Sequence, residues 1–108
     1  MSDPACRSQT VVVRLPREID IANAADVYAS LFGAIAPGTR VLVADMTSTS
    51  FCDSAGIGEI MLVRRSAMRG GVEFRMVVPR GGVLRVLQLQ GLDQVVQLFL
   101  TLEAALDR

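Results

Sequence analysis

The fold is decided by one stretch of the sequence, Val41-Leu42-Val43-Ala44-Asp45-Met46-Thr47-Ser48-Thr49-Ser50-Phe51-Cys52-Asp53-Ser54-Ala55-Gly56-Ile57-Gly58. It opens with a near-continuous apolar run of strand length, which is typical of a strand covered on both faces in a parallel or mixed sheet. A run of serine and threonine follows, and a helical pattern begins at about Ser54. A buried strand, a polar loop and a helix in this order indicate an α/β domain.

The same alternation of strands and helices extends along the rest of the chain. The predicted strands cover residues 10–15, 41–44, 73–78 and 95–100. The predicted helices cover residues 21–35, 54–69 and 83–90, and a weakly amphipathic tail covers residues 102–106. We therefore expect a single α/β domain in which helices pack against a small mixed β-sheet.

Apolar residues at helical spacing mark the core face of the first two predicted helices. In the first helix these residues are Ala25, Val27, Leu31, Phe32 and Ile35. In the second they are Ile57, Ile60, Met61 and Met68. We expect Met61, Met68 and Met76 to be packing residues, because methionine fills irregular gaps in cores.

Length and composition bound the domain organisation. A chain of 108 residues that is 51% hydrophobic and 20% charged can bury roughly two-thirds of the surface that its unfolded form exposes. It is therefore expected to fold as one domain over residues 10–108, preceded by a short flexible N-terminus at residues 1–9.

The charged residues exclude several classes of function. The eleven basic residues are all arginine, they are spread along the chain, and the formal net charge is zero, so no basic stripe for nucleic acid is present. Without lysine there is no P-loop lysine and no Schiff base. Without histidine the commonest general base and metal ligand are missing. We expect no catalytic residues, no metal site and no enzyme activity.

The two cysteines and the N-terminal residues indicate a cytoplasmic protein. Cys6 and Cys52 cannot supply a four-ligand zinc site, and we interpret both as reduced thiols. Cys52 should be inert, because burial and the neighbouring Asp53 both raise the pKa of a thiol. The first seven residues lack the apolar segment of a signal peptide, and no apolar run reaches the roughly 20 residues of a membrane-spanning helix.

A hydroxyl and a carboxylate lie where the second predicted helix begins. Asp53 and Ser54 precede backbone N–H groups that lack partners within the helix, so the position favours negative charge. A phosphate on Ser54 would gain about 0.3–1 kcal/mol there from the amides and the helix dipole. It would also place a charge of about −1.5 to −2 beside Asp53, which should disrupt a docked protein surface.

Two glycines follow in the same helix, at residues 56 and 58. Each costs up to about 1 kcal/mol relative to alanine, so another interaction must compensate. Close packing of the helix on the sheet is one explanation, and access of a partner to Ser54 along a bare first turn is the other. A third glycine of the dinucleotide-binding motif is missing, and an acidic residue precedes the pair, so we expect no cofactor.

The stretch from Asp45 to Gly58 resembles the signature of STAS domains, and especially that of bacterial anti-sigma factor antagonists. In that signature an apolar strand is followed by Asp, a short loop, Phe, and then Asp-Ser, a small residue, Gly and Leu or Ile. Two further segments, Glu18-Ile19-Asp20-Ile21-Ala22-Asn23-Ala24 and Leu87-Gln88-Leu89-Gln90-Gly91-Leu92-Asp93, are similar to family segments and lie in the expected order. The resemblance covers about residues 10–107.

The resemblance implies a switch in which proteins exchange partners. The unmodified antagonist binds an anti-sigma factor that is an ATP-dependent serine kinase, and this releases the sigma factor. Phosphorylation by that kinase breaks the complex, and a serine phosphatase restores it. By position, Ser54 is the implied phosphoacceptor, and the implied partner-binding residues are Asp20, Asp53, Ser54, Ala55 and Gly56.

The sequence departs from the family pattern at three positions. Arg17 stands where glycine is usual, Thr49 replaces an apolar residue, and Ala55 removes a second hydroxyl from the motif. Ser54 is therefore the only acceptor within the Asp-Ser-Ala-Gly motif, although Ser48, Thr49 and Ser50 lie nearby.

Two other interpretations remain open at this point. The chain could be a non-switching STAS scaffold or ligand-binding module in a signalling or transport complex. Arg64, Arg65 and Arg69 could meet an acidic partner, or they could form a solvated helix end that is favoured by the helix dipole.

Overall fold

The computed structural model describes residues 9–107 and shows one α/β domain. Its elements, in chain order, are β1 (Thr10–Arg14), β2 (Glu18–Ile19), α2 (Ala24–Gly33), β3 (Val41–Asp45), β4 (Phe51–Cys52), α3 (Ser54–Arg69), β5 (Glu73–Val77), α4 (Gly82–Leu89), the 3₁₀ turn η1 (Leu92–Gln94), β6 (Gln97–Phe99) and α5 (Leu102–Leu106). The predicted α/β class is confirmed, and the helix predicted over 54–69 has the predicted bounds at both ends.

The predicted flexible N-terminus lies outside the described residues, apart from Gln9. The carbonyl of Gln9 accepts hydrogen bonds from the amides of Arg40 and Val41, at 2.7 and 2.9 Å. Within residues 9–107, no helix is long and apolar enough to cross a membrane.

Four strands form the main sheet in the order β1-β3-β5-β6, and each neighbouring pair is parallel. β1 pairs with β3 along its whole length, from Thr10 opposite Val41 to Arg14 opposite Asp45. The expectation of a mixed sheet is therefore wrong for the described strands, because each return to the sheet is a crossover that carries a helix. The strand order never reverses along this sheet, so it has no switch point of the kind at which open α/β sheets bind ligands.

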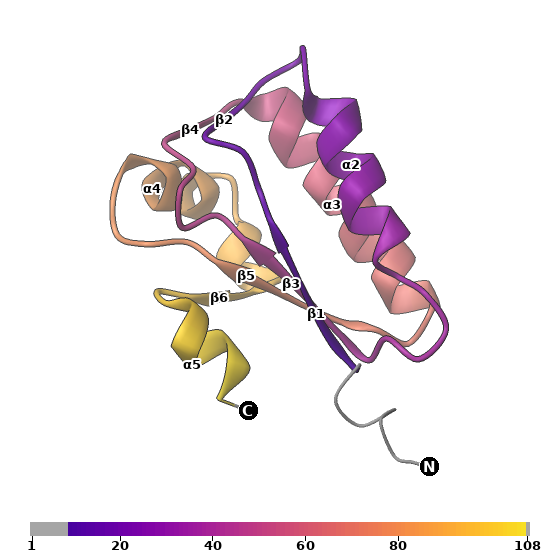
Figure 1. Cartoon of the computed structure of the whole chain (residues 1–108). Coiled ribbons are helices and arrows are strands. Elements are labelled where there is room, and N and C mark those ends of the chain that lie inside the picture. Colours follow the sequence, from indigo (N-terminus) through magenta and orange to yellow (C-terminus); the bar gives the residue numbers. More distant parts are fainter. Residues whose placement is uncertain (1–8, 108) are drawn as a thin grey trace.

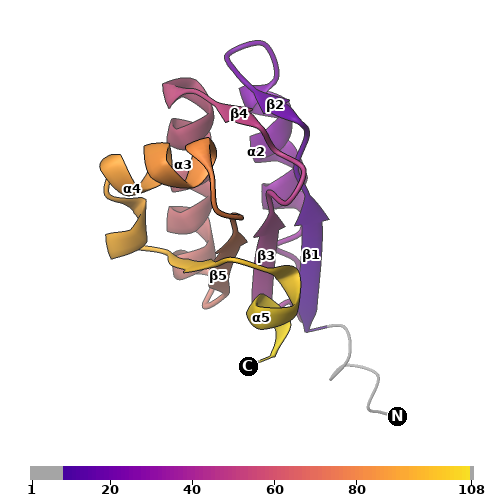
Figure 2. The same cartoon turned by 90° about the vertical axis from the view of Figure 1, so that its left-hand side faces the viewer.

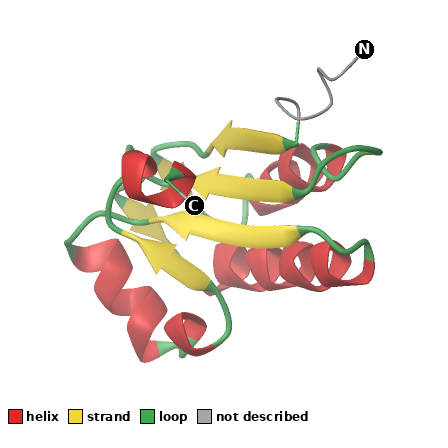
Figure 3. Ribbon diagram, turned by 90° about the horizontal axis from the view of Figure 1, so that it is seen from below, coloured by secondary structure: helices red, strands yellow, loops and turns green. Residues whose placement is uncertain are grey.

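The helices cover the two faces of the sheet unequally. Figure 1 shows α2 and α3 side by side against one face, with α5 on the opposite face. Figure 3 shows the strands of the sheet side by side, with the C-terminal helix lying across them on the near face. The larger core lies on the α2–α3 side, where α3 buries Ile57, Ile60, Val63 and Ala67 and α2 buries Ala24, Val27 and Leu31.

Several predicted core positions are wrong. Met68 is 62% exposed, and Ala25 and Phe32 are also exposed, whereas Met76 is fully buried as predicted. The stripe of 3.6-residue period passes through Ala24 instead of Ala25, and it has turned away from Met68 by the end of α3. Phe32 instead stacks on Tyr28 at the surface of α2, with ring centroids 5.5 Å apart.

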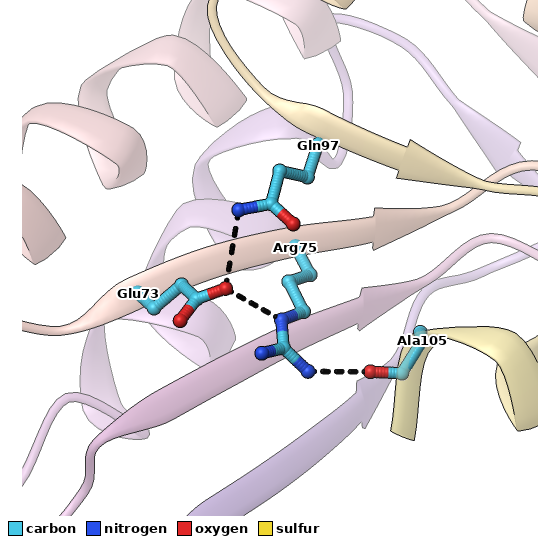
Figure 4. Close-up of polar contacts among 4 residues, drawn as sticks. All are labelled: Glu73, Arg75, Gln97 and Ala105. Carbon is cyan, nitrogen blue, oxygen red and sulfur yellow. Dashed lines mark hydrogen bonds and ion pairs between the residues drawn. The ribbon is translucent and has the colours of Figure 1, made fainter. Parts of the chain in front are cut away.

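A buried arginine holds α5 against the second face of the sheet (Figure 4). The Nε atom of Arg75 donates to Glu73 at 2.8 Å, and an Nη atom donates to the Ala105 carbonyl in α5 at 2.6 Å. The side-chain amide of Gln97 donates to the same Glu73 oxygen at 3.2 Å, and the Arg75 guanidinium lies 5.9 Å from the centroid of the Phe99 ring. These hydrogen bonds compensate for the burial of the Arg75 guanidinium. They also help to hold α5, which buries only one of its own residues, Ala105.

Candidate functional site

A short parallel ladder, β2 with β4, brings two distant segments of the chain together. Glu18 lies opposite Phe51, and Ile19 lies opposite Cys52. The amide of Asp53 then extends the pairing by donating to the Ile19 carbonyl at 3.1 Å. Figure 2 shows this ladder at one end of the molecule, beside the first turns of α2 and α3. The ladder thus places Asp20 next to the Asp53–Ser54 junction, and sequence periodicity gave no sign of two-residue strands.

Asp53 is the N-cap of α3. One oxygen of its carboxylate accepts from the amides of Ala55 and Gly56, at 3.0 and 3.1 Å, and its carbonyl accepts from the amide of Ile57 at 3.1 Å. The capping role expected of Asp53 is therefore observed. Two of the amides that we expected to be open to a phosphate are already engaged, so the helix start is a weaker anion site than the sequence indicates.

Ser54 is the first residue of α3, and its side chain is exposed. Within residues 9–107 its hydroxyl makes no hydrogen bond. The hydroxyl is thus free in solvent, while the backbone that carries it is fixed by the cap of Asp53. This combination suits a group that another protein must reach and align.

Asp20 organises the turn that leads into α2. Its carboxylate accepts from the amide of Ala22 at 2.9 Å, and its carbonyl accepts from the amides of Asn23 and Ala24 at 3.1 and 2.8 Å. Asn23 completes the turn, since its side chain accepts from the Asp20 amide and donates to the Glu18 carbonyl, at 3.0 and 2.7 Å. The turn leaves Ile21 83% exposed. Asn23 was missed, although an Asp-x-x-Asn spacing before a helix could have indicated it.

The two glycines of α3 have different roles. A Cβ atom on Gly56 would lie 2.5 Å from Cγ2 of Ile19 and 2.9 Å from the sulfur of Cys52, so close packing explains this glycine. A Cβ atom on Gly58 would meet nothing within 4 Å, and Gly58 is exposed. Packing therefore leaves Gly58 unexplained.

Two departures from the family pattern have local structural explanations. Thr49 is buried, and its hydroxyl donates to the Pro16 carbonyl at 2.7 Å. This hydrogen bond allows a hydroxyl to be buried where the family usually has an apolar residue. Arg17 contributes its carbonyl, which accepts from the amide of Ser50 at 2.8 Å. Any residue could supply that carbonyl, which explains why arginine is tolerated there.

Two further polar side chains, Asp45 and Arg64, have structural partners. The buried Asp45 carboxylate, at the end of β3, accepts from both the amide and the hydroxyl of Thr47. The Nε atom of Arg64 donates to the Val95 carbonyl at 3.0 Å, which gives this arginine a role in holding the chain after α4. Arg65 and Arg69 are exposed, and both interpretations stay open for them.

Cys52 has no features of a reactive cysteine. Burial, followed by the charge of Asp53, raises the pKa of its thiol from 9.0 to about 11. The prediction of a raised pKa is confirmed, and Cys6 lies outside the described residues. Among residues 9–107, no group of three or more histidine, cysteine or carboxylate side chains could hold a metal ion.

Comparison with known protein families shows which family this sequence and fold resemble. The sequence profile of the STAS domain matches residues 3–105. The chain belongs to the STAS domain family. Among characterised relatives of this STAS domain is the anti-sigma-F factor antagonist RsfB of Mycobacterium tuberculosis, which is 33% identical over 96 residues, or 88% of this chain and 77% of RsfB.

Solved STAS structures have the same architecture. An anti-sigma factor antagonist from Mycobacterium paratuberculosis superposes with a TM-score of 0.83 at 25% identity, over 92% of this chain and 84% of that chain. The phosphorylated form of the Bacillus cell fate determinant SpoIIAA superposes with a TM-score of 0.68 at 27% identity, over 94% and 91%. A sulfate transporter family protein from Wolinella succinogenes shares the fold at 14% identity, with a TM-score of 0.81 over 92% and 83%.

Proposed function

We propose that this STAS domain is an anti-sigma factor antagonist whose binding is switched by phosphorylation of Ser54. The observation that carries the proposal is the exposed, unbonded Ser54 hydroxyl on a helix start that Asp53 caps and Gly56 packs in place. The similarity to the antagonist RsfB supports the partner class, and the phosphorylated SpoIIAA structure supports the modification. The unmodified chain would bind an anti-sigma factor, release the sigma factor and so regulate transcription in the cytoplasm.

Phosphorylation would be carried out by the anti-sigma factor acting as an ATP-dependent serine kinase. The Ser54 Oγ–phosphorus bond forms while the bond from the γ-phosphorus to its bridging oxygen breaks, and ADP leaves. The hydroxyl proton passes to a base or water on the kinase. The chain contributes alignment, because the cap fixes the backbone that carries the Ser54 hydroxyl before the kinase binds.

The new charge would break the complex for electrostatic reasons. A phosphoserine adds a charge of about −1.5 to −2 beside Asp53, and Asp20 and Glu18 lie on the neighbouring ladder. Asp53 already occupies the amides of Ala55 and Gly56, so the helix start offsets this charge only weakly. The phosphate would also repel the nucleotide phosphates left on the kinase. A serine phosphatase would restore the binding form by hydrolysis.

The proposal is tested with purified anti-sigma factor kinases of the source organism and ATP. Mass spectrometry should place one phosphate on Ser54, Ser54→Ala should accept none, and Ser54→Asp should lose affinity for the kinase. Phosphate on Ser48 or Ser50 alone, or unchanged binding by Ser54→Asp, would contradict the proposal.

A second candidate is a non-switching STAS scaffold or ligand-binding module. The sulfate transporter family protein has the same fold, so the fold occurs in more than one class of protein and does not by itself require a phosphorylation switch. The two candidates differ in cells, where a non-switching module would respond normally with either Ser54→Ala or Ser54→Asp in place of the wild-type chain.

A further inference from the structure

An apolar furrow lies beside the Ser54 end of the molecule, between β4 and α4. We call it the β4–α4 furrow, and it is lined by Ser50, Phe51, Cys52, Gly82, Val83 and Val86. Its volume is about 240 Å³, and it shares Ser50, Gly82 and Val83 with a second hollow of about 280 Å³.

The furrow is bordered by large apolar side chains that stay in solvent. Phe51 is 51% exposed and Val86 is 39% exposed, while Leu89, three residues further along α4, is 77% exposed. Residues three apart on a helix lie on the same side, so Leu89 continues the surface of Val86. Aromatic and aliphatic groups around a concave site are typical of the anchoring centre of a protein interface.

The β4 side of the furrow is acidic. The exposed Glu18 lies opposite Phe51 in the ladder, and Asp53 follows Cys52 directly. Asp53 already accepts hydrogen bonds from two backbone amides, whereas the exposed Glu18 carboxylate would be buried with its charge unbalanced. A partner that covers this side must therefore bring a basic group as well as an apolar one, because burying an unbalanced negative charge is unfavourable.

A protein that phosphorylates Ser54 comes within reach of the furrow. A standard interface hides about 800 Å² on each partner, which corresponds to a patch about 16 Å in radius. Phe51 is three residues from Ser54 and therefore within about 11 Å of it along the chain. A kinase active site centred on the Ser54 hydroxyl reaches Phe51, and through it the mouth of the furrow.

We propose that the β4–α4 furrow receives an apolar side chain of the anti-sigma factor kinase that modifies Ser54. This docking proposal rests on the proposed function. Its occupant carries a basic group that faces Glu18 and Asp53, next to the apolar side chain that fills the space between Phe51 and Val86. The furrow then supplies affinity in the unmodified state, and Ser54 supplies the switch.

The test uses the full chain and the purified kinase that phosphorylates Ser54 in the experiment above. Val86→Glu should weaken kinase binding at least tenfold and lower the rate of Ser54 phosphorylation at low substrate concentration. Phe51→Ala should weaken binding in the same direction. Met68→Glu is the matched control, because Met68 is also an exposed apolar side chain on a helix but lies at the far end of α3, and it should bind like the wild type. Thermal unfolding must show that the variants fold.

Each outcome has a separate meaning. If the wild type is phosphorylated on Ser54 and folded Val86→Glu binds and reacts equally well, the furrow proposal is wrong and the proposed function stands. If no kinase modifies the wild type, both are wrong. Sedimentation of the protein alone should show a monomer, and a dimer that Val86→Glu dissociates would assign the furrow to a second copy of the chain instead.

Discussion

The two sides of the start of α3 differ sharply, although Gly56 on one side lies only two positions from Ser54 and from Gly58 on the other. On the inner side, Gly56 packs against Ile19 and Cys52 with no room for a methyl group. On the outer side, Ser54 and Gly58 are exposed, and a side chain at Gly58 would meet only solvent. The inner side fixes the backbone, and the outer side presents the hydroxyl. The difference indicates that stability and recognition can be altered separately within a single helical turn.

The largest expected effect tests the inner side through Cys52. With Cys6→Ser as background, the folded thiol should alkylate about a hundredfold more slowly than the urea-unfolded thiol at pH 8, since each pKa unit is tenfold. Alkylation followed against pH should show a midpoint near 11 instead of 9.0. Because the unfolded thiol loses its proton first, stability should fall as the pH rises between these two values. A midpoint near 9 would mean that Cys52 is not buried.

Gly56→Ala tests the packing directly. The added methyl group would overlap the side chains of Ile19 and Cys52, so we expect a loss of about 1–3 kcal/mol in the free energy of unfolding. Urea denaturation measures the loss. Unchanged stability would contradict the close approach of β2 to α3.

Asp53→Ala tests the boundary between the two sides. It removes the acceptor of two backbone amides, and losing such a cap typically costs about 1 kcal/mol. Asp53→Asn should retain most of the stability, because an amide oxygen can still accept. If both variants were equally destabilised, the charge of Asp53 would matter more than its hydrogen bonds.

The smallest effect is expected on the outer side. Gly58→Ala should stabilise the protein by up to about 1 kcal/mol, as alanine is the better helix former and meets no neighbour. It is the matched control for Gly56→Ala, with the opposite sign. If the bare turn serves kinase access, Gly58→Ala should also slow phosphorylation of Ser54. Faster or equal phosphorylation would leave Gly58 without a functional explanation.

The elements that the sequence predicted best are long and strongly periodic. The helix over 54–69 was correct at both ends, because Asp53 caps it and a pair of glycines ends it. The ladder of β2 with β4 escaped prediction, since two-residue strands have no period to detect. Met68 was misassigned because apolar character at the end of a helix does not say which way its side chain faces.

The sequence alone determined the alternation of strands and helices, the absence of lysine and histidine chemistry, and the Asp-Ser-Ala-Gly junction at a helix start. Only the tertiary structure decided that Asp20 lies beside that junction and that the Asp53 carboxylate, and not a phosphate on Ser54, bonds the first amides of the helix. It also decided that Gly56 is closely packed whereas Gly58 is not. The physical reason is that capping and periodicity act within a few residues. The contacts of Ile19 with Gly56, by contrast, join segments that only folding brings together.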